Sequence, residues 1–205
     1  MVAIAMKNPG CVIKRLITRL FLAISLAYAG VVWPAEQSAP SKSVDDELRD
    51  LLLDTIANSD SFEDKYEAEV WLVSMSERLK PFVTNPSERL QLLRNVHRYA
   101  RAHEIQPSLV LAVIEVESAF DRYAVSRVGA QGMMQIMPFW KHEIGRPEDN
   151  LIDLETNLQY GVTILKHYLD REQGRWPEAL ARYNGSYGSY RYAIKVMDAW
   201  EKRWK

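Results

Sequence analysis

The segment from Leu109 to Ile114 (LVLAVI) constrains the fold of this chain more than any other stretch. It is apolar on every side of the helix that Pro107 is placed to start, so that helix has no face suited to water. A helix of this kind lies at the centre of a domain, with other helices packed around it. We therefore expect a central, buried helix over residues 107–118.

The rest of the chain also has the apolar spacing of helices. Leucines and aromatic residues recur at three- and four-residue steps, and no segment alternates with the period of a strand. The predicted helices cover residues 44–57, 62–79, 85–99, 107–118, 139–145, 153–169, 176–184 and 192–204. The predicted fold class is all-α, with at most a tiny β-sheet near residues 125–137.

Most of the aromatic side chains, and Met75, are expected to face the core along these helical stripes. Trp140 and Trp176 have the same core interpretation, although the flat face of each could also stack on the ring of a ligand. Tyr187 and Tyr190 follow the Asn184-Gly185 turn, and for them a position on the rim of a cleft is as well supported as one in the core.

The first 29 residues differ in kind from the rest. They carry four basic residues and no acid, and the segment from Leu20 to Val32 is free of charge. Ala27-Tyr28-Ala29 places small residues where signal peptidase cuts, which together predicts a secretory signal over residues 1–29 and a periplasmic protein. The alternative is an uncleaved membrane anchor, although a membrane span needs about 20 apolar residues. Residues 30–43, polar and bearing proline, are the predicted linker.

Composition excludes several classes of function. The chain has 205 residues and a net charge of −1, and removal of the leader with its four cations leaves −5, which argues against nucleic-acid binding. Cys11 is the only cysteine and lies before the apolar segment, so neither a lipid anchor nor thiol chemistry is expected. The four histidines lack metal-ligand spacing, so we predict no metal and surface positions for them.

Glu117 is the candidate for acid–base chemistry. Its neighbours three, four and seven residues back on the helix are all apolar: Ile114, Val113 and Val110. A carboxyl group against such a surface loses solvation, which raises its pKa and suits it to act as a general acid. Glu115 lies about 200° away around the helix and cannot face the same side. The alternative is a helix-end glutamate paired with Arg122 or Arg127.

Three ordered motifs accompany this glutamate. They are Glu117-Ser118, the loop Gly132–Pro138 (GMMQIMP), and Tyr183-Asn184. In these motifs and in the spacing of the first two, residues 90–204 resemble the Slt-type lytic transglycosylases, which share the goose-type lysozyme fold. Two departures are Met133, where the family has leucine, and Arg182, where it has alanine; the second leaves the subsite preference open.

The resemblance implies a role for each matching position. Glu117 would be the catalytic acid/base, Ser126 a hydroxyl that contacts it and the substrate, Gln135 and Met137 residues that line the sugar cleft, Tyr183 the tyrosine beside the glutamate, and Asn184 the neighbouring amide. The implied reaction cleaves the β-1,4 bond between MurNAc and GlcNAc in peptidoglycan and forms 1,6-anhydroMurNAc. No cofactor is implied.

A single acid fits that reaction, because a glycosidase of the usual kind needs two carboxyl groups. Asp121 is near in sequence but is equally suited to a turn. Two alternatives stay open: hydrolysis on the same fold, and an envelope protein that binds peptidoglycan without cleaving it. We predict accessory helices over residues 44–89 and a lysozyme-like SLT domain over 90–205, with glycan strands as the partner. A loose association with the membrane or an envelope complex is left open.

Overall fold

The computed structural model describes residues 44–57, 60–62 and 64–205, and these residues are mainly helical. The helices are α1 (Val44–Ala57), α2 (Lys65–Leu79), α3 (Pro86–Ala102), α4 (Pro107–Ser118), α5 (Trp140–Ile144), α6 (Leu154–Arg171), α7 (Trp176–Tyr183), α8 (Arg191–Ala199) and the π-helical turn η2 (Trp200–Trp204). The all-α prediction is confirmed. Within the described ranges, β-structure is limited to isolated bridges from Gln131 to Val125 and Ile136. The predicted leader and linker lie outside the described residues.

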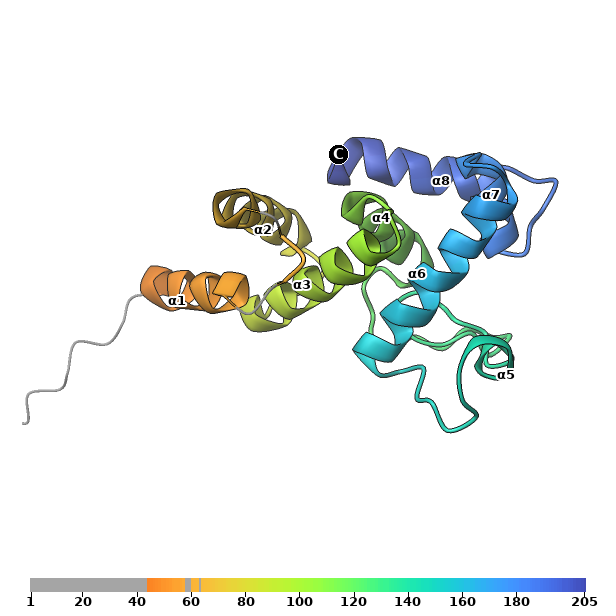
Figure 1. Cartoon of the computed structure of the whole chain (residues 1–205), viewed down its shortest axis with the longest axis horizontal. Helices are drawn as coiled ribbons and strands as arrows, with labels where there is room; N and C mark the ends of the chain where they lie inside the picture. The colour runs from red at the N-terminus through yellow and green to blue at the C-terminus, as the bar shows by residue number, and fades with distance from the viewer. Residues whose placement is uncertain (1–43, 58–59, 63) are drawn as a thin grey trace, which may run out of the picture. The chain divides into compact units, whose positions relative to one another are not determined.

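Helix α4 is the central helix, as its sequence predicts. Residues 110–114 are fully buried, and α4 packs against α3, α8 and η2 (Figure 1). Its first charged residue is Glu115, in the last turn, so the buried part of the helix carries no charge. Helix α4 ends at Ala119, whose φ of 51° is left-handed and turns the chain away.

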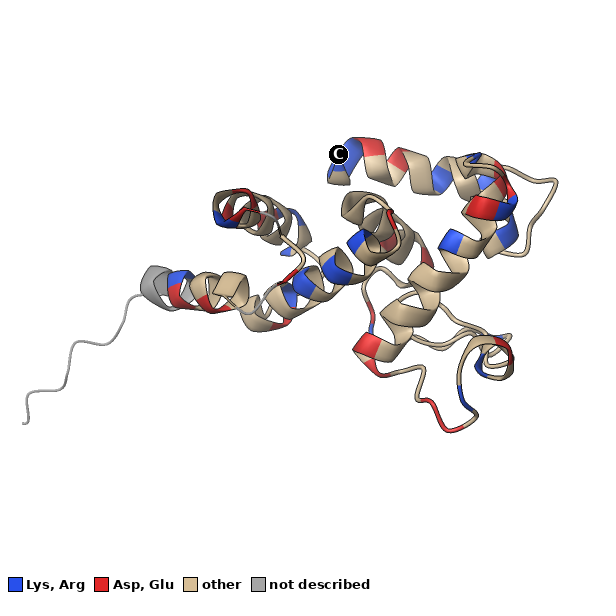
Figure 2. Ribbon diagram, in the orientation of Figure 1, with Lys and Arg blue, Asp and Glu red and all other residues tan. Residues whose placement is uncertain are grey.

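Helix α6 is the second long element beside the functional motifs. It packs against α3 and α7, and its middle turns carry no charged side chain, as the tan stretch in Figure 2 shows. Asp153 caps its first turn by accepting a hydrogen bond from the Thr156 amide at 3.0 Å. Gly161 lets the side chain of Met134 lie directly on the helix, since a Cβ there would stand 2.3 Å from the Met134 sulfur.

Helices α1 and α2 pack on each other and on α3. The described residues belong to one compact unit, and α3 runs unbroken from Pro86 to Ala102. Helix α2 begins at Lys65, three residues later than predicted, because the Asp64 carboxylate accepts hydrogen bonds from the first-turn amides and caps the helix there. No helix in the described ranges is long and apolar enough to span a bilayer.

The surface prediction is wrong for His97. The residue is 8% exposed, and its ring stacks on Phe62 with centroids 3.6 Å apart, while Trp71 covers it edge-on. Ser61 forms a hydrogen bond with its Nδ1 at 2.8 Å. Burial, with the nearby charge of Arg101, lowers the pKa of His97 to about 4, so the ring is a neutral part of the core at physiological pH.

Candidate active site

Glu117 lies in the last turn of α4 with its carboxyl group half-buried. The hydroxyl of Tyr192, on α8, donates a hydrogen bond to Glu117 Oε1 at 2.6 Å. Burial raises the pKa of Glu117 from about 4.5 to about 7, and the hydrogen bond from Tyr192 opposes this rise. Near neutral pH the carboxyl group is therefore protonated about half of the time and can both donate and accept a proton.

Glu115 faces a different part of the molecule, as the helical geometry predicts. Its two oxygens accept hydrogen bonds from Arg203 Nη1 at 2.9 Å and Trp204 Nε1 at 2.7 Å. These contacts attach the end of the chain to α4. Two glutamates only two residues apart thus have separate surroundings and separate hydrogen-bond partners.

The loop of residues 132–138 is held against the end of α4. Ser118 Oγ donates a hydrogen bond to the Met133 carbonyl at 2.8 Å, which connects the two motifs directly. Gln135 has a left-handed φ of 50°, a conformation that costs energy for a residue with a side chain. Its amide nitrogen donates to the carbonyls of Gly132 at 2.9 Å and Ala124 at 3.2 Å, so this side chain holds its own loop.

Tyr183 connects the same loop to α7. Its hydroxyl donates a hydrogen bond to the Met134 carbonyl at 2.8 Å. Burial and the charge of Glu117 raise the pKa of Tyr183 well above its usual value, so the hydroxyl stays protonated beside the acid. Tyrosines from α7 and α8 therefore flank Glu117, one held on the loop and the other on the carboxyl group.

The other predicted site residues have more peripheral positions. Ser126 Oγ accepts a hydrogen bond from the Ala130 amide at 3.0 Å and closes a turn. Met137 is partly exposed, and Asn184 is exposed at the C-cap of α7. Asp121 supports a turn through the Tyr123 amide at 2.9 Å. Within the described residues the hydrogen bonds of these side chains do not include one to Glu117.

Tyr192 is the site residue that the sequence analysis missed. Its helical spacing places it on the buried stripe of α8, where only a core role was expected. A usable signal existed, because a buried tyrosine hydroxyl needs a hydrogen-bond partner and a core of leucine and valine provides none. In the structure that partner is the carboxyl group of Glu117.

The side chain of Asn157 also holds the loop of residues 132–138 in place. The residue is 1% exposed on α6, and its Oδ1 accepts a hydrogen bond from the Met134 amide at 2.8 Å. Its amide nitrogen donates to the carbonyls of Gln131 at 2.9 Å and Leu151 at 2.8 Å. Gly132 has to be glycine here, since its φ is 74° and a Cβ would stand 2.4 Å from Asn157 Nδ2.

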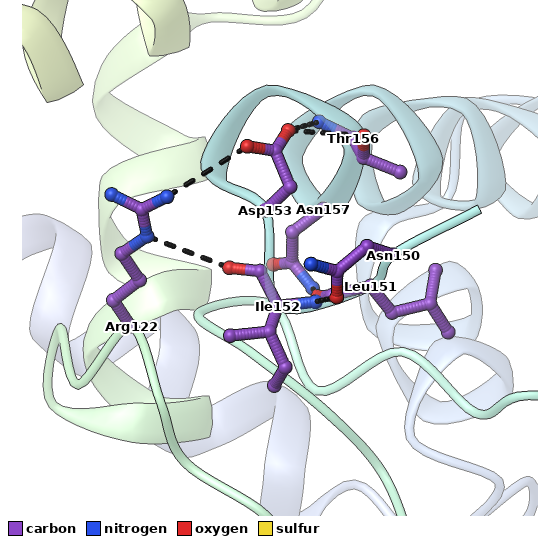
Figure 3. Close-up of polar contacts among 7 residues, drawn as sticks. All are labelled: Arg122, Asn150, Leu151, Ile152, Asp153, Thr156 and Asn157. Atoms are coloured by element: carbon purple, nitrogen blue, oxygen red, sulfur yellow. Dashed lines mark hydrogen bonds and ion pairs between the residues drawn. The ribbon is translucent and has the colours of Figure 1, made fainter.

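Figure 3 shows the neighbouring contacts at the start of α6. Arg122 donates to the Ile152 carbonyl at 3.5 Å and lies 3.7 Å from the Asp153 carboxylate. The alternative in which Arg122 serves as the charge partner of Glu117 is therefore not realised. Among the described residues, His, Cys, Asp and Glu side chains form no group that could hold a metal ion.

The sequence also matches a known protein family. The family described as transglycosylase SLT domain matches residues 94–203, more than half of the chain. The chain belongs to this family. The match covers all three motifs, from Glu117-Ser118 through the loop of residues 132–138 to Tyr183-Asn184.

Individual relatives are similar to parts of this chain. A membrane-bound lytic murein transglycosylase C of Actinobacillus pleuropneumoniae serotype 5b (strain L20) is 50% identical over 48 residues, which are 23% of this chain and 13% of that protein. A transglycosylase of Enterobacteria phage PRD1 is 30% identical over 110 residues, 54% of this chain and 40% of that protein. The 70 kDa soluble lytic transglycosylase of Escherichia coli superposes with a TM-score of 0.43 at 20% identity, covering 77% of this chain and 32% of that chain. The chain thus spans less than half the length of these relatives.

Proposed function

We propose that this chain is a lytic transglycosylase that cleaves the β-1,4 bond between MurNAc and GlcNAc in peptidoglycan. The observation that carries the proposal is the half-buried carboxyl group of Glu117, whose pKa is raised to about 7 and which is held by Tyr192. Membership of the SLT family, and relatives named as lytic murein transglycosylases, support this substrate class.

In the proposed reaction Glu117 acts first as an acid. Its proton passes to the glycosidic oxygen, the bond from MurNAc C1 to that oxygen breaks, and the GlcNAc end leaves as an alcohol. The Glu117 carboxylate then accepts the proton of the MurNAc C6 hydroxyl as that oxygen bonds to C1. The product is a 1,6-anhydro ring, the N-acetyl group is proposed to assist at C1, and Glu117 ends protonated without consumption of water.

The surrounding residues have proposed supporting roles. Tyr192 holds one carboxyl oxygen, which fixes the direction of the proton, and Tyr183 keeps the 132–138 loop beside the acid. We propose that Ser126, Gln135, Met137 and Asn184 contact the glycan strand around this centre. Met137 is partly exposed and Asn184 is exposed, which suits contact with a long polymer.

Analysis of the products decides between this proposal and hydrolysis. We expect digestion of purified sacculi to release fragments that end in 1,6-anhydroMurNAc, because the proposed nucleophile belongs to the substrate. Mass spectrometry separates the two outcomes, since a hydrolysed end is heavier by one water. Reducing ends in place of anhydro ends would show ordinary hydrolysis, and intact sacculi would support a protein that only binds peptidoglycan.

The rate of lysis should depend on the protonation of Glu117. The general acid is active in its protonated form, so we expect the rate to fall as the pH rises through about 7. Tyr192→Phe removes the hydrogen bond that lowers this pKa, so the fall should move to higher pH. The pH–rate profile and an NMR titration of the carboxyl carbon measure the shift. Tyr66→Phe, at an exposed residue of α2, serves as the control, and an unmoved profile in Tyr192→Phe would contradict the assignment.

The remaining parts of the chain have proposed roles of their own. We propose that residues 1–29 export the protein to the periplasm and that residues 30–43 act as a linker. Helices α1 and α2 would then be an accessory layer on α3, with the catalytic SLT domain beginning near residue 90.

A further inference from the structure

Glu172, at the C-cap of α6, is a charged side chain that is only 4% exposed. Its Oε1 accepts a hydrogen bond from Arg182 Nε, and its Oε2 accepts one from Arg175 Nη2 at 3.2 Å. The hydrogen bond from Arg182 is the main cause of a lowered pKa at Glu172. A carboxylate at such a position requires charged partners, so these contacts fix where the Arg182 side chain lies.

The other side of the Arg182 guanidinium faces an aromatic ring. Its central carbon lies 3.7 Å from the centroid of the Tyr187 ring, which is a cation–π contact at short distance. Tyr187 is 59% exposed, so one face of the ring rests on the guanidinium and the other is open to solvent. Gly185 and Gly188, both with positive φ, surround Tyr187, and a loop with two such glycines contributes little stiffness of its own.

The loop that carries Tyr187 is attached to the candidate active site at both ends. It joins α7 to α8 and projects from them at the right of Figure 1. Four residues before Tyr187, the hydroxyl of Tyr183 bonds to the Met134 carbonyl. Five residues after it, the hydroxyl of Tyr192 bonds to Glu117. The open face of Tyr187 therefore lies, along the chain, between the two tyrosines that hold the loop of residues 132–138 and the acid.

We propose that Tyr187 is a stacking surface for a pyranose ring of the glycan strand, and that Arg182, anchored on Glu172, is the residue that positions it. The inference rests on the proposed function and deepens it, because it names a subsite of the same strand-binding surface. Aromatic faces suit the apolar C–H face of a sugar, and a preformed surface avoids ordering the loop during binding. An alanine at position 182 would lack both contacts, so the arrangement depends on the arginine.

The test compares the kinetics of full-length variants on glycan strands. We expect Arg182→Ala and Tyr187→Leu each to raise KM by about three- to tenfold with kcat close to that of the parent. Tyr187→Phe keeps the ring and should keep KM. The double variant Arg182→Ala/Tyr187→Leu should be no worse than Tyr187→Leu alone, because Arg182 acts through that ring.

Arg175→Ala is the matched control. It removes the other arginine that contacts Glu172 and leaves the Tyr187 ring unchanged, so its KM should stay near that of the parent. Its thermal stability should fall by an amount similar to that of Arg182→Ala. Equal rises in KM in both arginine variants, an additive double variant, or an unchanged KM in Tyr187→Leu would overturn the proposal. If Arg182→Ala does not fold, Tyr187→Leu and Arg182→Lys test the proposal in its place. Arg182→Lys keeps the positive charge but loses the planar contact with the Tyr187 ring.

A second measurement separates this inference from the proposed reaction. Strand binding is measured by co-sedimentation with sacculi in a Glu117→Gln background, where no bond is cleaved. Weaker binding by the added Tyr187→Leu change supports the stacking surface, and equal binding refutes it, whichever product the active enzyme forms. Failure of the proposed reaction is recognised independently, by reducing ends among the products or by lysis that persists in Glu117→Gln.

Discussion

Glu117→Gln should abolish the lysis of sacculi and should make the protein more stable than the parent at alkaline pH. The amide cannot donate the proton to the glycosidic oxygen, and general acid catalysis of this kind contributes about 10²–10⁴ in rate. Turbidity loss of purified sacculi, followed over hours, measures the rate. Lysis within a few-fold of the parent would refute the assignment of Glu117 as the acid.

The gain in stability follows from the raised pKa. The folded state holds the proton of Glu117 up to about pH 7, whereas the unfolded chain loses it near 4.5. The stability that comes from this proton is complete below about pH 4.5 and is lost as the pH rises to about 7. A glutamine carries no charge to bury, so at pH 8 the variant should unfold with a free energy higher by on the order of 2 kcal/mol. Urea unfolding should show this gain at pH 8 and its absence at pH 4.

Glu115→Gln is the matched control on the same helix. It weakens the contacts to Arg203 and Trp204, so it should lower the free energy of unfolding by about 1 kcal/mol while leaving lysis unchanged. The opposite outcomes expected from two neighbouring glutamates separate a catalytic role from a structural one. Loss of lysis in Glu115→Gln would show that the effect of Glu117→Gln is not specific to the acid.

Local rules were sufficient to predict the framework of this site. The uniformly apolar sequence before Glu115 predicts the buried α4, and the 100° step of a helix separates the directions of Glu115 and Glu117. Both are confirmed by residues 110–114, which are fully buried, and by the different partners of the two acids. Such features depend only on residues within one helix.

Features that depend on distant contacts could not be predicted. His97 is buried because aromatic rings from two other segments cover it, and the sequence of its own helix does not predict these contacts. Tyr192 lies on a core stripe, and only its hydroxyl distinguishes it from its apolar neighbours. The direction of Arg182 depends on Glu172, which belongs to another helix. In each case the deciding partner lies outside the helix of the residue that it positions.

Asn157→Ala should be the most destabilising single change near the active site. It leaves one backbone amide and two carbonyls, of Met134, Gln131 and Leu151, without their side-chain partner in a buried place. Each unsatisfied buried group costs about 1–3 kcal/mol, so we expect the free energy of unfolding to fall by about 3–5 kcal/mol. Urea unfolding at pH 7 measures the loss.

Asn150→Ala provides the comparison seven residues earlier. Asn150 is exposed, and its side chain accepts one hydrogen bond from the Ile152 amide at 3.0 Å, so its removal should cost no more than about 1 kcal/mol. A loss in Asn157→Ala as small as that of Asn150→Ala would mean that the three backbone groups find other partners.

Asn157→Ala should also lower the rate of lysis in molecules that remain folded. The Met134 backbone is held from both sides, by Asn157 at its amide and by Tyr183 at its carbonyl, so releasing the amide loosens the loop that lies beside Glu117. Asn157→Asp should not restore the loop. It keeps an acceptor for the Met134 amide but sets a carboxylate against the carbonyls of Gln131 and Leu151, where two donors are needed. If Asn157→Asp were as stable and active as the parent, the amide of Asn157 would not be what holds the loop in place.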